Sequence, residues 1–476
     1  MNVSNLPKQN MIADLSVKKL ANRSLLLLLS LSFKLFAQIA VIFIYARHLS
    51  YQDYGSYQSV WLYTNIIGVI GLFGLPSLIL SASIKNIKNW IGENKITFWI
   101  GVILMNLIPF TYILFFYTQL SFSIRLLLTA LIITQNVCII TETIAIKSEK
   151  EKLVLISNII FNIGFLGYHI FVLYYGYTLH LLLTGLIILY LVKTFFVMSF
   201  SYRIRIHEKN VAIPNLGKQW LYLGLNDTLG IIFKWLDKWV ILLLVSVTQF
   251  AVYFNGSYEI PVFALMLSAV GNIMLVELSK HSMNDRYIKM LFNTSSILLA
   301  SIVFPSFAFL LFYHTDFFIL IFSKKYADAI PVFVISIFII PVRITYYTAV
   351  LQIRHRSDLI VRGSAIDLII AIVLIFILYP FLQMRGLALA FVISTYAQAG
   401  YYLWETSRVI HQKIDSFFPL QKLLWIMLIS ILITAPPYFL FNQIQSKWGL
   451  IIGVIITIIL IIGLLKYNIK KSHVED

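Results

Sequence analysis

The feature that most constrains this chain is a succession of long apolar runs separated by short polar segments. Each run is near or above the ~20 residues that an α-helix needs to cross a bilayer. The chain has 476 residues, of which 60% are hydrophobic and only 12% are charged, about half the charged fraction of a soluble protein. The sequence therefore predicts an all-α polytopic membrane protein. Its fourteen candidate spans cover residues 24–46, 57–82, 96–117, 122–146, 153–175, 179–200, 219–246, 251–277, 289–313, 329–351, 360–379, 386–405, 422–441 and 448–466.

Lysine and arginine residues are distributed unevenly between the two sides of these spans. With the N-terminus in the cytoplasm, 26 of the 37 basic residues fall on the cytoplasmic side, six fall outside and five lie within spans. Membrane proteins keep such an excess of basic residues in their cytoplasmic loops. This split predicts fourteen helices with both termini cytoplasmic. It also explains the net charge of +17 without a nucleic-acid partner. The single cysteine, Cys138, excludes an intramolecular disulfide and makes a metal cluster unexpected.

The chain divides at a cytoplasmic joint over residues 201–218. We expect helices 1–6 in residues 1–200, helices 7–12 in residues 219–405, and two further helices with a cytoplasmic tail in residues 406–476. The halves share a short similar segment, which reads aromatic, small, any residue, tyrosine. It is Tyr54-Gly55-Ser56-Tyr57 after helix 1 and Phe250-Ala251-Val252-Tyr253 after helix 7. Duplicated halves around a midplane site are a common transporter plan.

These segments, together with Tyr45-Ala46-Arg47-His48-Leu49 and Leu236-Asp237-Lys238, give the chain a resemblance to the multidrug/oligosaccharidyl-lipid/polysaccharide (MOP) flippase superfamily. Within it, the chain is most similar to the O-antigen and capsule repeat-unit flippases. The resemblance implies two pseudo-symmetric six-helix lobes around a central cavity, plus two C-terminal helices. It also implies alternating access for an undecaprenyl-diphosphate-linked oligosaccharide across the bacterial inner membrane. The lipid II branch implies several cavity arginines, whereas Arg343 is the single arginine away from the ends of a span here.

Cations within the spans are the candidate ligands for a diphosphate headgroup, because charges at membrane depth are usually functional. Lys34 and Lys234 lie near the middle of helices 1 and 7, and Arg343 lies near mid-depth in helix 10. Lysine binds phosphate as a point charge and arginine as a bidentate fork. Lys193 and Lys238 come next as candidates, although snorkelling to the interface is open to both. The alternative for each cation is an ion pair that only fixes helix packing.

Acids within the spans are candidates for coupling transport to H⁺ or Na⁺. Asp367 and Glu259 are preferred, because neither has a basic residue within a turn of its own helix. Asp227 shares a helix face with Lys234 and Lys238 at ~100° per residue. Asp237 is interpreted as an ion-pair partner of its basic neighbours. Glu142 and Glu277 lie near cytoplasmic helix ends. The sequence leaves open whether transport is coupled at all, and it predicts no metal and no other cofactor.

Two further patterns accompany these charges. Polar-aromatic clusters, such as Trp61 with Tyr63 and Asn65, and Arg343 with Tyr346 and Tyr347, offer rings that stack on sugars, although packing or interfacial belts are favoured. Prolines lie within several spans, and Pro261 and Pro341 each lie two residues from a charge. Each proline predicts a kink, either as a hinge beside a site or as a bend that packs better.

Three functions compete on this evidence. The first is a flippase for lipid-linked oligosaccharides, with membrane lipids, a polysaccharide polymerase and a chain-length regulator as expected partners. The second is a membrane-embedded polymerase or ligase, but the outer loops are short and hold Asp53, Asp316 and Asp328 as their acids. The third is a small-molecule exporter of the same fold, for which more acids than bases would be expected within the spans. The flippase is preferred, and no enzymatic activity is predicted.

Overall fold

The structure is a computed structural model that describes residues 32–82, 84–148, 150–201, 216–280, 285–354, 356–441 and 446–475. The described residues are helical with connecting turns, and the chain divides into two compact units between Thr248 and Gln249. Nine described helices are long and apolar enough to cross a membrane. The predicted all-helical, multi-pass membrane fold is confirmed, and the count of fourteen spans stays a prediction. Most of the predicted 201–218 joint lies outside the described residues.

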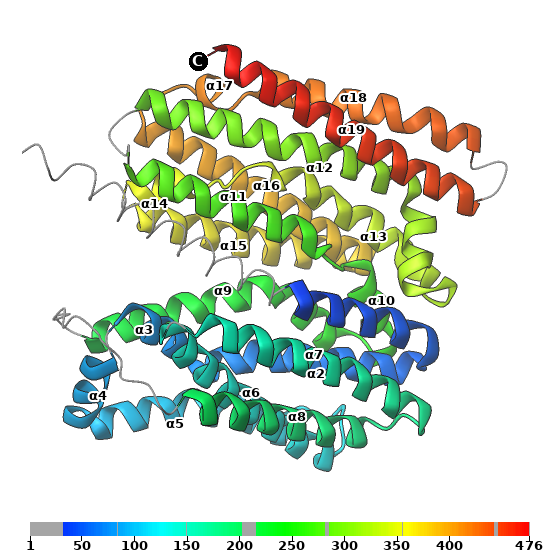
Figure 1. The fold of residues 1–476 in the computed structure, drawn as a ribbon. Helices are drawn as coiled ribbons and strands as arrows, with labels where there is room; N and C mark the ends of the chain where they lie inside the picture. Colours follow the sequence, from blue (N-terminus) through cyan, green and yellow to red (C-terminus); the bar gives the residue numbers. More distant parts are fainter. Residues whose placement is uncertain are drawn as a thin grey trace, which may run out of the picture. The chain divides into compact units, whose positions relative to one another are not determined.

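The first unit begins with a described helix over residues 32–48, drawn in dark blue in Figure 1. The elements that follow are α2 (Tyr51–Leu72), α3 (Leu75–Ser81), α4 (Ile84–Glu93), α5 (Lys95–Thr111) with a π turn (Tyr112–Phe116), α6 (Phe122–Lys147), α7 (Glu151–Tyr174), α8 (Leu179–Ser201) and α9 (Leu216–Leu244). The helix α10 (Val247–Gly256) lies across the boundary between the units.

Small residues and buried amides hold the first unit together. The side chain of Asn136 on α6 donates to the carbonyl of Gly68 at 3.0 Å, and that of Asn106 on α5 donates to Gly71 at 3.1 Å. Both acceptors are glycines of α2, where the absence of a side chain lets neighbouring helices approach closely. The helix α2 therefore packs against α5, α6 and α9, while α8 lies along α6 and α7.

The α2 span does not run unbroken to residue 82. It ends at Leu72, and Phe73 and Gly74 both take positive φ angles before α3 begins with Pro76 in its first turn. Proline is favoured there because the first turn of a helix leaves its N–H groups unbonded. A short amphipathic helix, α4, then packs Ile87 and Trp90 against Phe98 of α5 and Trp220 of α9.

The second unit contains α11 (Pro261–Lys280), α12 (Asp285–Phe322), two 3₁₀ segments (Lys324–Ala329 and Ile337–Ile344) flanking α13 (Ile330–Ser336), α14 (Ala349–Ile353), α15 (Ser357–Leu382), α16 (Met384–Val409), α17 (Ile414–Phe417), α18 (Leu420–Phe441) and α19 (Ser446–Glu475). The long α12 is the most buried of the candidate spans in the described chain, and it packs against α18 and α19 (Figure 1). Its backbone is non-helical at Tyr313, so a kink coincides with the predicted end of this span at residue 313. A second helical stretch, which carries the buried Phe318 and Phe322, then runs on to the end of α12.

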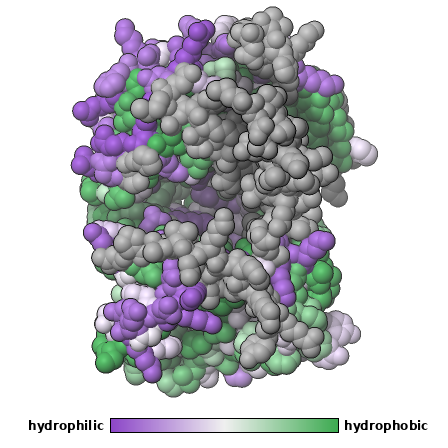
Figure 2. Space-filling view, turned by 60° about the vertical axis from the view of Figure 1, so that its left-hand side comes forward, coloured by the Kyte–Doolittle hydropathy of each residue, from purple (hydrophilic) through white to green (hydrophobic). Residues whose placement is uncertain are grey.

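The outer surfaces of the spans match a lipid environment. Large apolar side chains such as Phe195, Phe376 and Ile459 are mostly exposed. On the face drawn in Figure 2, hydrophilic residues gather in patches and hydrophobic residues show along the flanks. Exposed apolar surface of this extent marks contact with lipid rather than water.

Candidate functional site

The first unit brings three of the predicted cations into one electrostatic neighbourhood. The ammonium group of Lys34, on the 32–48 helix, interacts with the charges of Lys193 on α8 and Lys234 on α9, and with the carboxylate of Glu142 on α6. The Lys34 and Lys234 side chains are exposed, whereas Lys193 is buried. Three helices thus place cations of the first unit near one another, a fourth adds the carboxylate of Glu142, and two of the cations are exposed. We call Lys34, Lys193 and Lys234 the lysine group.

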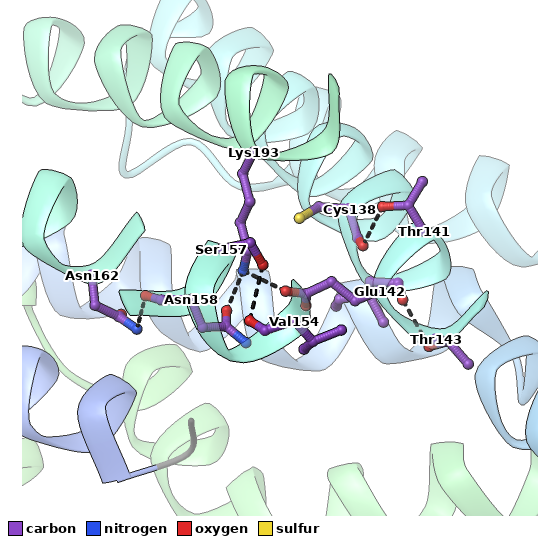
Figure 3. Close-up of polar contacts among 10 residues, drawn as sticks. Cys138, Thr141, Glu142, Thr143, Val154, Ser157, Asn158, Asn162 and Lys193 are labelled. Atoms are coloured by element: carbon purple, nitrogen blue, oxygen red, sulfur yellow. Dashed lines mark hydrogen bonds and ion pairs between the residues drawn. The ribbon is translucent and has the colours of Figure 1, made fainter. Parts of the chain in front are cut away.

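Lys193 is held by two other helices of the same unit (Figure 3). Its Nζ lies 2.7 Å from Oε1 of Glu142 on α6 and donates to Oδ1 of Asn158 on α7 at 2.5 Å. The ammonium group also lies 4.6 Å from the ring centroid of Phe161. Glu142 was not among the sequence candidates, because its position near a helix end offered a sufficient explanation for its charge. No pattern along the sequence pairs it with a lysine 51 positions away.

The charges of α9 have contrasting surroundings. Lys238 and Asp237 are both buried and form an ion pair of 2.8 Å. Lys234, one turn earlier, is exposed and lies 5.7 Å from the ring centroid of Trp235. Asp227 accepts a hydrogen bond of 2.7 Å from the hydroxyl of Ser77 on α3. The expected charged face of this helix is therefore divided among different partners.

The second unit has a charge group of its own. Arg343 donates to Glu259 at 3.2 Å, and 32% and 52% of their side chains are exposed. Both residues lie where helices are interrupted: Glu259 is in the non-helical segment between α10 and α11, and Arg343 has a non-helical backbone just before extended Thr345. Interrupted helices in transporters free backbone groups for binding. The partner of Glu259 comes from another helix, which the spacing along its own helix did not reveal.

Asp367, on α15, is near the same group. Its carboxylate interacts with the hydroxyl of Ser394 on α16 and with the charge of Arg343. The second unit therefore assembles Glu259, Arg343 and Asp367 from three elements. Among the residues that the structure describes, no group of three His, Cys, Asp or Glu side chains is arranged to hold a metal ion.

The aromatic candidates are mainly packed. The Tyr63 ring is buried and lies 4.6 Å from that of Tyr117, and the amide of Asn65 donates back to the carbonyl of Trp61. The motif tyrosines Tyr45 and Tyr57 stack edge to face at 4.9 Å inside the first unit. In this structure, these rings pack inside the first unit and are not free to stack on a sugar.

Comparison of the fold with solved structures gives three broad similarities. The lipid II flippase MurJ in an inward closed conformation has a TM-score of 0.68 at 15% identity, covering 94% of this chain and 99% of that protein. An inward-facing MATE family multidrug transporter of the MOP superfamily has a TM-score of 0.59 at 13% identity, covering 80% and 98%. A MOP superfamily transporter from Pyrococcus furiosus has a TM-score of 0.57 at 11% identity, covering 83% and 97%.

Comparison by sequence identifies the family. No curated protein matches the chain. The family described as "Polysaccharide biosynthesis protein" matches residues 44–331, more than half of the sequence. The chain therefore belongs to the polysaccharide biosynthesis protein family and has the fold of MOP superfamily transporters.

Proposed function

We propose that this protein is a flippase that moves undecaprenyl-diphosphate-linked oligosaccharide repeat units, of an O-antigen or a similar surface polysaccharide, across the bacterial inner membrane. The observation that supports this most strongly is the lysine group of the first unit. Three ammonium groups share one neighbourhood there with the carboxylate of Glu142. A cationic, partly exposed group at membrane depth suits an anionic headgroup, because cations form charge-assisted hydrogen bonds with phosphate oxygens.

The proposal assigns Lys34 and Lys234 as ligands of the diphosphate, since both are exposed beside Lys193. Arg343 supplies a further headgroup cation in the second unit, with Glu259 and Asp367 as candidate sites for H⁺ or Na⁺ coupling. The lipid tail stays in the bilayer, while the glycan follows the headgroup during alternating access. The distribution of basic residues supports a cytoplasmic location for both termini.

Export in cells tests the function. Deleting the gene should leave lipid-linked repeat units accumulating on the cytoplasmic face while surface polysaccharide disappears. Surface polysaccharide at the wild-type level in the deletion strain would refute the proposal.

Substitution of the lysines tests the site. Lys34→Ala and Lys234→Ala should each lower the affinity for the lipid-linked substrate about tenfold or more, because a hydrogen bond to a charged group contributes roughly 1.5–3 kcal/mol. Surface polysaccharide should fall while immunoblots show the same amount of protein in the membrane. Lys88→Ala, which removes an exposed lysine of α4, is the matched control and should export normally. Full activity in both lysine variants would refute the assignment.

A further inference from the structure

The ion pair between Lys193 and Glu142 is the feature of the lysine group that phosphate binding alone does not explain. Lys193 is the member of the group that has an acidic partner at 2.7 Å and an amide acceptor at 2.5 Å. Figure 3 shows its side chain reaching from α8 between α6 and α7, toward Glu142 and Asn158. In this arrangement the carboxylate occupies the place beside the ammonium group that a phosphate oxygen would need.

The charges around this pair leave a surplus that fits the proposed headgroup. With all three ammonium groups protonated, Lys34, Lys193 and Lys234 carry three positive charges, and the ionised carboxylate of Glu142, which interacts with Lys34, carries one negative charge. The surplus is therefore two positive charges. A diphosphate that joins a lipid to a sugar has one ionised oxygen on each phosphate. The two negative charges of the headgroup therefore neutralise the surplus of the lysine group while Glu142 remains charged. Among the described residues, Cys138 on α6 and Tyr190 on α8 are further titratable groups that interact with members of the pair, and both are uncharged in their protonated form.

The carboxylate side of the pair is partly exposed. The Lys193 side chain is 8% exposed, but that of Glu142 is 18% exposed. A lysine has a flexible stem and three donors, so its ammonium group can keep Asn158 while it exchanges the carboxylate for another anion. Transport further requires that a ligand bind firmly enough to enter and weakly enough to leave.

We propose that Glu142 is an internal competitor for the diphosphate: its carboxylate pairs with Lys193 in the empty state, the headgroup displaces it, and renewed pairing assists release. This inference rests on the proposed function. It assigns Glu142 as a residue that sets substrate affinity, with no direct contact to the glycan. A pair that merely joined α6 to α8 would affect stability but would not affect the affinity for anions.

Binding to the purified full-length protein tests this. The probe is undecaprenyl diphosphate without a glycan, and undecaprenol is its uncharged counterpart. Wild type should bind the diphosphate in preference to undecaprenol. Glu142→Gln should bind the diphosphate about tenfold more tightly, because Lys193 is released, whereas Lys193→Ala should bind it more weakly. The double variant should match Lys193→Ala, since the gain needs the lysine. Glu93→Gln, which alters an exposed carboxylate on α4, should match wild type.

The outcomes separate the two proposals. Equal or weaker binding by a folded Glu142→Gln variant, or a gain that persists in the double variant, would overturn the competitor role while leaving the flippase in place. If wild type does not distinguish the diphosphate from undecaprenol, the proposed function fails and this inference fails with it. Should Glu142→Gln not fold, Glu142→Asp keeps the charge but withdraws it from Lys193. That variant should show a smaller gain in affinity, and no gain would again overturn the competitor role.

Discussion

At the scale of single residues, burial distinguishes lysines that the sequence treats alike. Lys234 and Lys238 lie one turn apart on α9, yet Lys234 is exposed and Lys238 is buried against Asp237. A buried charge that loses its partner strongly destabilises the protein, whereas removal of an exposed charge changes the stability little. The same residue type on the same helix is therefore expected to serve binding at one position and stability at the other.

Unfolding measurements on α9 variants test this distinction. Lys238→Ala should lower the free energy of unfolding by about 3–5 kcal/mol, because Asp237 would remain buried and unpaired. Lys234→Ala should change it by no more than about 0.5 kcal/mol. Thermal or denaturant unfolding of the purified protein in detergent reports both values. Equal losses of stability in the two variants would contradict the distinction.

The sequence located the charges and paired Asp237 with a basic neighbour on its own helix, but it could not identify partners on other helices. Helical periodicity relates positions within one span, so Lys34, Lys193 and Lys234 were recognised from their depth. The pairing of Lys193 with Glu142 and Asn158 joins three helices, and that packing is determined by contacts between distant segments. For the same reason, Arg343 was recognised while its contact with Glu259 was not.

At the scale of elements, interruptions of the helices were partly predictable. Pro261 and Pro341 each indicated a kink, and the structure has a helix break or irregular backbone near both. The sequence did not reveal that Phe73 and Gly74 form the break before α3, because positive φ angles depend on the neighbouring helix. It also treated the basic segment after helix 2 as a loop, where the structure has the amphipathic helix α4. The ten residues of α4 are too few to be recognised as a membrane span, which needs about 20.

The break at Gly74 makes a prediction about stability. Gly74 has a φ of 72°, and a Cβ there would lie 2.4 Å from the backbone nitrogen of Gly224 on α9. Gly74→Ala should therefore cost about 1–3 kcal/mol from the left-handed backbone, with the displacement of α9 adding to this. Gly92→Ala is the control, because its Cβ would meet no atom within 4 Å in helical α4, and it should stabilise by about 0.5–1 kcal/mol. Melting temperatures should move in opposite directions, and a Gly74→Ala protein as stable as wild type would contradict the strain.

At the scale of the whole molecule, packing divides the chain differently from the predicted lobes. The first compact unit extends to Thr248 and includes α9, which the sequence places at the start of the second half. The helix α9 packs on α2 and α3, and a Cβ at Gly55 would lie 2.2 Å from the carbonyl oxygen of Val247. The start of α2 at Gly55 therefore lies close against the start of α10 at Val247. Whether the functional lobes divide at residues 201–218 stays a prediction.

The predicted membrane topology depends on whether α16 crosses the membrane. Length and composition identify Lys324–Ile344 and Asp358–Leu382 as spans but do not identify α16, which carries Ser394, Thr395 and Gln398 in its middle. The distribution of basic residues nevertheless requires α16 to cross, because Lys324 is predicted outside and Lys413 inside. With three crossings between them, exposed cysteines placed at these two positions should lie on opposite sides of the membrane.

Thiol labelling measures this directly, since the native Cys138 is only 1% exposed and adds little background. In spheroplasts treated with a membrane-impermeant maleimide, Lys324→Cys should be labelled at once, and Lys413→Cys only after the membrane is permeabilised. Lys88→Cys on α4, predicted inside, should behave like Lys413→Cys. Labelling of both Lys324→Cys and Lys413→Cys from outside would show that α16 does not cross. The polar residues of α16 would then need another explanation, and the even number of spans on which both cytoplasmic termini depend would be lost.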